Sequence, residues 1–205
     1  MNILYWVGWL ASRFVFSIVF HGKIIGKENI PKTGGFIFAS NHISYYDPPF
    51  LGSCVNREMN YMAKDTLFKN KFLNWVITTV NTRPVKRGGF DRKAIEISIE
   101  LVKSGQGILI FPEGTRSKTD NFLPPRPGIG KIAVEAQCMV VPAYIHASNS
   151  LWHSFIGKKR LFVACGVPLS VDWISQFSAD KESYLKISQK IMDEIAKLKS
   201  DNLKN

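Results

Sequence analysis

Strand-type and helix-type segments alternate along the chain, and this alternation limits its possible folds more than any other feature. The strand-type runs are rich in Phe, Ile, Val and Ala, whereas the segments between them carry apolar residues at helical spacing or typical helix start and stop residues. This order predicts an α/β fold, with a layered, largely parallel or mixed sheet flanked by helices. The strand-type runs are residues 23–31 with their turn, 34–40, 59–63, 107–114, 139–145 and 160–171; the helix-type segments are 47–55, 67–80, 91–105, 128–137 and 181–200.

The length and charge of the chain narrow the class of partner. A chain of 205 residues suits one domain with a single good core. Lys and Arg outnumber Asp and Glu by 27 to 16, and the net charge of +11 indicates nucleic acid, an anionic membrane surface or a phosphorylated substrate. Nucleic acid is the least supported of these three partner classes, because the aromatic residues concentrate in the first 20 positions rather than among the basic residues. The three cysteines, Cys54, Cys138 and Cys165, lie far apart in apolar contexts, which predicts reduced core residues.

The N-terminal segment, MNILYWVGWLASRFVFSIVF, is mostly apolar and aromatic. At helical spacing, one side carries its polar and indole side chains: Asn2, Trp6, Trp9, Arg13 and Ser17. Arg13 would be costly in a helix that spans a bilayer. We therefore expect an amphipathic helix lying in the membrane interface, with this polar side at head-group level and the Ile, Leu, Val and Phe side among the acyl chains. The alternative is a core helix that packs on the domain.

A histidine and a carboxylate follow the strand-type run at 34–40. We expect Asp47 to be the N-cap of a helix that has Pro48 at its first position, so that the preceding turn folds back and brings the carboxylate to His42. A neutral imidazole held in this way can take a proton from a hydroxyl with its second nitrogen. The substrate's own hydroxyl is the simplest nucleophile, since the sequence supplies no nucleophile elbow. The alternative is a surface histidine beside an ordinary helix cap.

Three further stretches carry groups suited to a phosphorylated substrate. In FPEGTRS (111–117), Arg116 offers a fork that fits phosphate, and Glu113 can accept a hydrogen bond from a hydroxyl. In RPVKRGG (83–89), Arg87 stands beside glycines that permit close backbone approach. In VVPA (140–143), Pro142 interrupts a buried strand, which indicates a sheet edge or a pocket wall.

Taken together and in this order, NHISYYD, RPVKRG, FPEGTRS and VVPA resemble the four sequence blocks of the glycerolipid acyltransferases. The closest resemblance is to the bacterial 1-acyl-sn-glycerol-3-phosphate (lysophosphatidic acid) acyltransferases. The blocks span residues 41–143, about half the chain. YMAKDTLF also resembles the lysine-bearing segment between the first two blocks of that family, and RPGIGKIA resembles the helix start after the third.

The resemblance implies transfer of a fatty acyl group from a coenzyme A or acyl-carrier-protein thioester to lysophosphatidic acid. His42 would be the general base and Asp47 its partner. The substrate-binding residues would be Lys64, Arg87, Glu113, Gly114, Thr115, Arg116 and Pro142. Neither a metal nor a cofactor beyond the thioester co-substrate would be needed. Arg83 departs from the family's second block, which leaves both Arg83 and Arg87 as candidates for the phosphate contact.

The N-terminal segment and the resemblance together imply a place in the cell and a division of the chain. We expect a peripheral or monotopic protein on the cytoplasmic face of the membrane, bound to anionic lipids, with a membrane-interface helix over 1–20 and an acyltransferase domain over 21–205. The same chemistry on glycerol-3-phosphate or another lysophospholipid is an alternative, although the single-domain length favours lysophosphatidic acid. A non-catalytic membrane-binding module is disfavoured because His42, Asp47 and Glu113 are all present.

Overall fold

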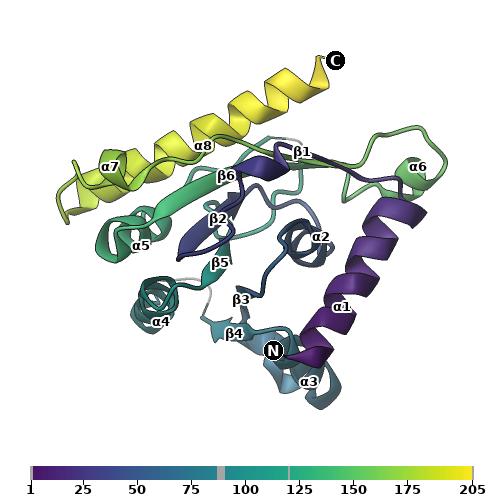
Figure 1. Ribbon diagram of the computed structural model, residues 1–205, viewed down its shortest axis with the longest axis horizontal. Coiled ribbons are helices and arrows are strands. Elements are labelled where there is room, and N and C mark those ends of the chain that lie inside the picture. Colours follow the sequence, from purple (N-terminus) through teal and green to yellow (C-terminus); the bar gives the residue numbers. More distant parts are fainter. Residues whose placement is uncertain (1, 87–90, 120, 205) are drawn as a thin grey trace.

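A single mixed sheet organises the protein. The computed structural model describes residues 2–86, 91–119 and 121–204, and within these residues seven strands pair in the order β1-β7-β6-β2-β5-β3-β4 (Figure 1). All neighbouring strands are parallel except β6 and β7, so the predicted α/β class with a largely parallel or mixed sheet is confirmed. The strands are β1 (Lys23–Ile25), β2 (Phe36–Ser40), β3 (Met59–Lys64), β4 (Thr82–Val85), β5 (Gly107–Ile110), β6 (Met139–His146) and β7 (Phe162–Cys165).

Helices cover both faces of this sheet (Figure 1). Helices α4, α5 and α8 pack on one face, whereas α1 and α2 pack on the other. The helices are α1 (Ile3–Phe14), which continues into a π-helical turn (Val15–Val19), α2 (Asp47–Cys54), α3 (Lys71–Thr79), α4 (Arg92–Lys103), α5 (Gly128–Ala136), α6 (Leu151–Phe155), α7 (Val171–Ile174) and α8 (Lys181–Leu203). Two short 3-10 turns occupy Lys27–Asn29 and Asp65–Lys69.

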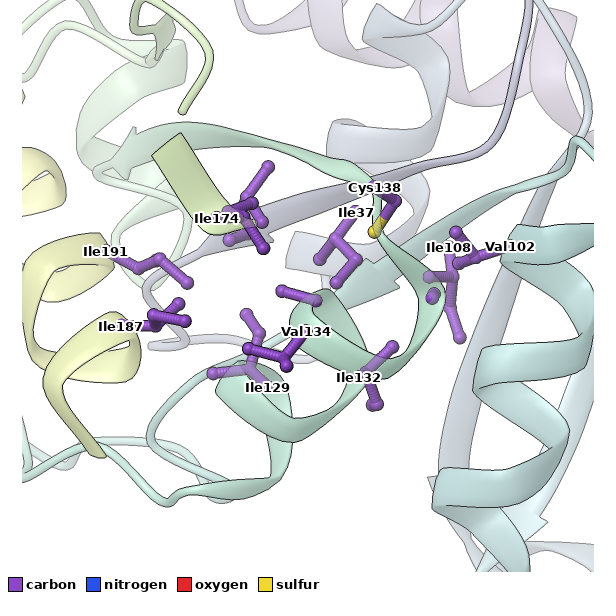
Figure 2. Packing of buried hydrophobic residues seen from close by; sticks show 14 of the residues in the cluster. Ile37, Val102, Ile108, Ile129, Ile132, Val134, Cys138, Ile174, Ile187 and Ile191 are labelled. Carbon is purple, nitrogen blue, oxygen red and sulfur yellow. The ribbon is translucent and has the colours of Figure 1, made fainter. Parts of the chain in front are cut away.

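Strand β2 shows why the central strands are apolar throughout. Ile37 points to the layer of α5 and α8, whereas Phe36 and Phe38 point to the layer of α1 and α2, and all three are completely buried. Figure 2 shows Ile37 with Ile108 of β5 and Ile187 of α8 around the same apolar space. Burying a side chain of this size stabilises the fold by about 1.5–3 kcal/mol. Both faces of β2 are therefore core, and its carboxyl end at Ser40 is rigidly placed.

The expectation that Pro142 marks a sheet edge is wrong, because β6 lies between β7 and β2. Val140 exchanges both backbone hydrogen bonds with Leu169, and the Gly166 amide donates to the Pro142 carbonyl. Alternate residues of a strand direct their amides to the same neighbour. The amide that Pro142 lacks would thus face the stretch from Gly166 to Leu169, outside the β6–β7 ladder, which begins at Ala143. A proline is tolerated there inside a central strand.

Helix α1 turns its polar and indole side toward the domain. The Trp9 indole donates to the Val55 carbonyl at 2.8 Å, and the Arg13 guanidinium donates to the Ser53 carbonyl at 3.3 Å. Both carbonyls lie at the end of α2, where backbone acceptors lack helical partners. The placement of this side at head-group level is therefore wrong: these donors serve the protein's own backbone.

The opposite side of α1 is exposed and apolar. It consists of Ile3, Leu4, Val7, Leu10, Phe14 and Ile18, each more than half exposed. Phe16, one residue beyond Val15, is instead completely buried and packs on Phe50 of α2. The helix is thus anchored to the domain, and the division of the chain at residue 20 stays a prediction. In the described part of the chain, no helix has both the length and the apolar composition needed to cross a bilayer.

Candidate active site

The turn between β2 and α2 brings the histidine and the carboxylate together. His42 Nδ1 lies 2.7 Å from Asp47 Oδ2, and both side chains are buried. The turn follows the carboxyl end of a parallel strand, which is where ligand sites gather in open α/β sheets. The proximity expected from the five-residue spacing is therefore present in the structure.

Asp47 reaches the histidine from a different position than expected. It is the first residue of α2, and Tyr46 occupies the N-cap, so the assignment of Asp47 as N-cap is wrong. Its Oδ2 also accepts hydrogen bonds from the amides of Ile43 at 2.7 Å and Ser44 at 2.8 Å. The carboxylate thus closes the turn by bonding backwards to the loop, which is the usual use of Asp at such positions.

Ser148 completes the surroundings of the carboxylate. Its hydroxyl donates to Asp47 Oδ1, and the serine is completely buried just after β6. All of these neighbours are donors, and an ionised carboxylate is an acceptor only. This set favours the imidazole tautomer in which Nδ1 carries the proton toward Asp47, and Nε2 is then the nitrogen that can accept a proton.

The segment 111–117 fixes the backbone and the ring of His42. The Phe111 ring stacks on the imidazole at 3.9 Å with an interplanar angle of 11°. The His42 amide donates to Glu113 Oε1 at 3.0 Å, and the Ser117 amide donates to the His42 carbonyl at 2.8 Å. Two blocks that lie about 70 residues apart in sequence therefore form one rigid unit around the imidazole.

Glu113 is a part of this framework and does not line the cavity beside His42. It is buried, and its second oxygen accepts from the Leu123 amide at 2.8 Å. Burial raises the pKa of Glu113, while the hydrogen bonds from Leu123 and His42 oppose this rise. Because both oxygens accept backbone amides, the geometry does not support the expected contact between Glu113 and a substrate hydroxyl.

A cavity of about 580 Å³ opens beside the imidazole, between β3, β5, α4 and α5. Its apolar lining includes Met62, Ile95, Leu109, Ile129 and Ile132, and His42 lines it too. Two exposed cationic residues, Lys86 and Arg126, also contribute to the lining. The site thus combines an imidazole, a largely apolar cavity and two exposed cationic side chains in its lining.

The expected substrate-binding residues divide into two groups. Gly114 and Thr115 line the cavity. Arg116 lies close to the turn between β2 and α2 (residues 41–46), which we call the catalytic turn: its guanidinium carbon is 3.5 Å from the centre of the Tyr45 ring. Lys64 and Pro142 do not line the cavity: Lys64 is exposed at the end of β3, and Pro142 is buried in β6.

The structure describes one of the two arginines of the second block that are candidates for the phosphate contact. Arg83 is exposed in β4, whereas Arg87 lies outside the described residues. The choice between them stays open.

Sequence reasoning missed three residues that shape the site. Ser148 donates a hydrogen bond to Asp47, which lies 101 residues earlier in the sequence. The Asn41 side chain makes two hydrogen bonds with the Ile145 backbone and so connects the turn to β6. Arg126 packs along Gly114, whose φ of +69° and lack of a Cβ make room for the arginine side chain. One signal was available in the sequence: Arg126 is the first residue of RPGIGKIA, the glycine-bearing helix start.

Among the described residues, no group of three or more His, Cys, Asp or Glu side chains is placed to hold a metal ion. The three cysteines are free and buried, as predicted.

Comparisons with known proteins agree with this geometry. A family model described as Acyltransferase matches residues 21–146. A 1-acyl-sn-glycerol-3-phosphate acyltransferase of Bacillus subtilis is 32% identical over 161 residues, which cover 78% of this chain and 79% of that protein. A lyso-ornithine lipid O-acyltransferase of Pseudomonas aeruginosa is 25% identical over 67% of this chain and 52% of its own length. The crystal structure of the 1-acyl-sn-glycerophosphate (LPA) acyltransferase of Thermotoga maritima aligns with a TM-score of 0.69 and 25% identity, over 98% of this chain and 78% of that one.

Proposed function

Because the chain belongs to the acyltransferase family, we propose that it transfers a fatty acyl group from an acyl thioester to the free hydroxyl of lysophosphatidic acid, giving phosphatidic acid. The observation that carries this proposal is the buried His42–Asp47 pair beside a largely apolar cavity that has two exposed cations in its lining. The donor is acyl-coenzyme A or an acylated carrier protein. Both are co-substrates.

The mechanism uses His42 as the base. Its Nε2 takes the proton of the acceptor hydroxyl as the oxygen attacks the thioester carbonyl. The imidazolium that forms is stabilised by the Asp47 carboxylate, whose oxygens also accept hydrogen bonds from the Ile43 and Ser44 amides and the Ser148 hydroxyl. Collapse of the tetrahedral intermediate breaks the carbon–sulfur bond, and the imidazolium returns the proton to the thiolate. The acyl group passes directly to the acceptor, so no protein nucleophile is required.

The cavity has groups suited to both the acyl chain and the phosphate of a lysolipid. Its apolar walls suit an acyl chain, and each buried CH₂ group contributes about 0.8 kcal/mol. Arg126 and Lys86 in its lining are suited to a phosphate, to which Arg116 and Arg87 are further candidates. Gly114 and Thr115 would lie against the glycerol backbone. Roles for Lys64 and Pro142 in substrate binding remain predictions, with less geometric support.

The membrane is the source of the acceptor, and the exposed apolar side of α1 is our candidate contact with it. Helix α3 lies beside the start of α1, because the Asn2 side chain donates to the Thr79 carbonyl, and α3 also exposes apolar side chains, Phe72 and Trp75. We propose that the protein binds the cytoplasmic face of the membrane as a peripheral or monotopic enzyme. Replacing Leu10 by Glu should lower binding to anionic vesicles without unfolding, since Leu10 is 64% exposed.

A thiol-release assay tests the proposed function. Purified protein in detergent is given either acyl-coenzyme A or an acylated carrier protein, with lysophosphatidic acid, glycerol-3-phosphate or lysophosphatidylcholine as acceptor. Release should be fastest with lysophosphatidic acid, and it should be lost in His42→Ala but not in His153→Ala, an exposed histidine of α6. Equal release with and without every acceptor, or full activity of His42→Ala, would refute the proposal.

The acceptor could instead be another lysolipid, and one comparison favours this alternative. The Pseudomonas aeruginosa relative is named for a lyso-ornithine lipid. If Arg126→Ala weakens the use of lysophosphatidic acid and of a lysolipid without phosphate equally, the phosphate contact is wrong and the alternative acceptor gains support.

A further inference from the structure

Helix α6 presents a second exposed aromatic surface, far from α1 in sequence. Trp152 is 69% exposed and Phe155 is 52% exposed, and their rings stack with centres 5.9 Å apart. Ile156 beside them is 42% exposed. The chain continues directly into three exposed cations, Lys158, Lys159 and Arg160. We call these six residues the α6 patch. A compact cluster of exposed aromatic and apolar side chains bordered by cations is a feature that folding alone does not explain.

The α6 patch lies near the C-terminal end of α1. Leu151, the first residue of α6, packs on the same core cluster as Phe16 and Phe20, which follow α1. Figure 1 shows α6 beyond the C-terminal end of α1. That end of α1 exposes Phe14 and Ile18, so exposed apolar side chains occur both there and on α6.

Buried residues close in sequence to each surface connect it to the catalytic turn. On one side, Phe50 of α2 packs on Phe16 and on Tyr46, which precedes Asp47. On the other side, Ser148 donates to Asp47 and lies only three residues before α6. A surface that binds at α1 and at α6 would therefore hold the catalytic turn between its two contacts.

We propose that the α6 patch is a second membrane contact, which docks the catalytic turn on an anionic bilayer together with α1. This inference rests on the proposed function, because the acceptor is a bilayer lipid. Trp at the interface with neighbouring Lys and Arg is the composition that anionic membrane surfaces attract. A second copy of this chain is a poorer occupant, since its net charge of +11 would oppose Lys158, Lys159 and Arg160.

A fluorescent label at position 152 tests the contact directly. The native cysteines are buried, and burial raises the pKa of Cys54 and of Cys138 to about 12, so a thiol introduced by Trp152→Cys reacts selectively. The matched control is Leu185→Cys on α8, which is 40% exposed on the opposite side of the sheet. Vesicles of phosphatidylcholine and phosphatidylglycerol should shift the emission of an environment-sensitive label to the blue at position 152 only. An unshifted label at 152 on protein that sediments with the vesicles would overturn the proposal.

A pair of substitutions separates membrane contact from structural support. Trp152→Ala/Phe155→Ala should bind these vesicles at least about tenfold more weakly, because two partly inserted aromatic side chains are lost. The control pair, Leu185→Ala/Leu203→Ala, should bind normally. Thiol release from detergent-dispersed acceptor should be unchanged in both pairs. If the aromatic pair loses activity in detergent as well, α6 only supports Ser148, and the inference is wrong.

The remaining outcomes are also distinguishable. A change of oligomeric mass in Trp152→Ala/Phe155→Ala, with vesicle binding unchanged, would assign the patch to a second copy and refute the membrane contact. Failure of the wild-type protein to release thiol with any acceptor would refute the proposed function, while the label at position 152 would still report whether α6 meets the membrane.

Discussion

Replacing Ser148 by Ala tests how the carboxylate is used. The change removes the hydroxyl that donates to Asp47 Oδ1, in a site with no exposure to solvent. Asp47 keeps the amides of Ile43 and Ser44 and the imidazole of His42. A hydrogen bond to a charged group contributes about 1.5–3 kcal/mol, so the free energy of unfolding should fall by about this amount. Urea unfolding followed by circular dichroism measures this loss.

The same substitution should change catalysis in a way that simple destabilisation does not. With one donor fewer, the Asp47 carboxylate interacts more strongly with the imidazolium form of His42. The acid limb of the pH profile of kcat/KM should therefore move to higher pH. We also expect kcat at the pH optimum to fall about 10- to 100-fold, because the carboxylate is less firmly oriented.

A buried serine elsewhere provides the control. Ser188 of α8 is completely buried and accepts from the Gly130 amide, far from the catalytic turn. Ser188→Ala should lose stability and leave the pH profile unchanged. An unshifted acid limb in Ser148→Ala, or a limb displaced to lower pH, would refute the proposed support of Asp47.

Three further predictions concern the same site. His42→Ala should lower kcat about 10²- to 10⁴-fold, the range for general bases, and Asp47→Asn should cost less, as steady-state thiol release would measure. Glu113→Gln should make the free energy of unfolding less dependent on pH. Burial raises the pKa of Glu113, so the wild-type protein loses stability as pH rises from the ordinary glutamate pKa through the raised one. Urea unfolding measured across this pH window would show no difference between the two proteins if the carboxylate were not buried. Arg126→Ala should lower kcat/KM for lysophosphatidic acid about 10- to 100-fold without changing donor saturation; an effect on donor KM alone would place the phosphate elsewhere.

The fold class and the catalytic pair could be read from the sequence because both depend on local order. The residues of β2 are apolar at every position because both faces of the strand are buried, and such runs between helices specify an α/β sheet. His42 and Asp47 are joined by one short turn, so their approach requires only that the turn fold back. Burial of the three cysteines also followed from the apolar residues around them.

Only the tertiary structure decided how the polar groups are used. Glu113 bonds the His42 amide and Ser148 bonds Asp47, each across a separation that depends on which strands are neighbours, and no local pattern encodes that order. The N-terminal helix shows the same limit. Its periodicity reveals two unlike sides, but Trp9 and Arg13 face the protein because free carbonyls at the end of α2 lie there. Amphipathicity defines the sides of a helix, whereas the acceptors within reach in the folded chain decide which side is buried.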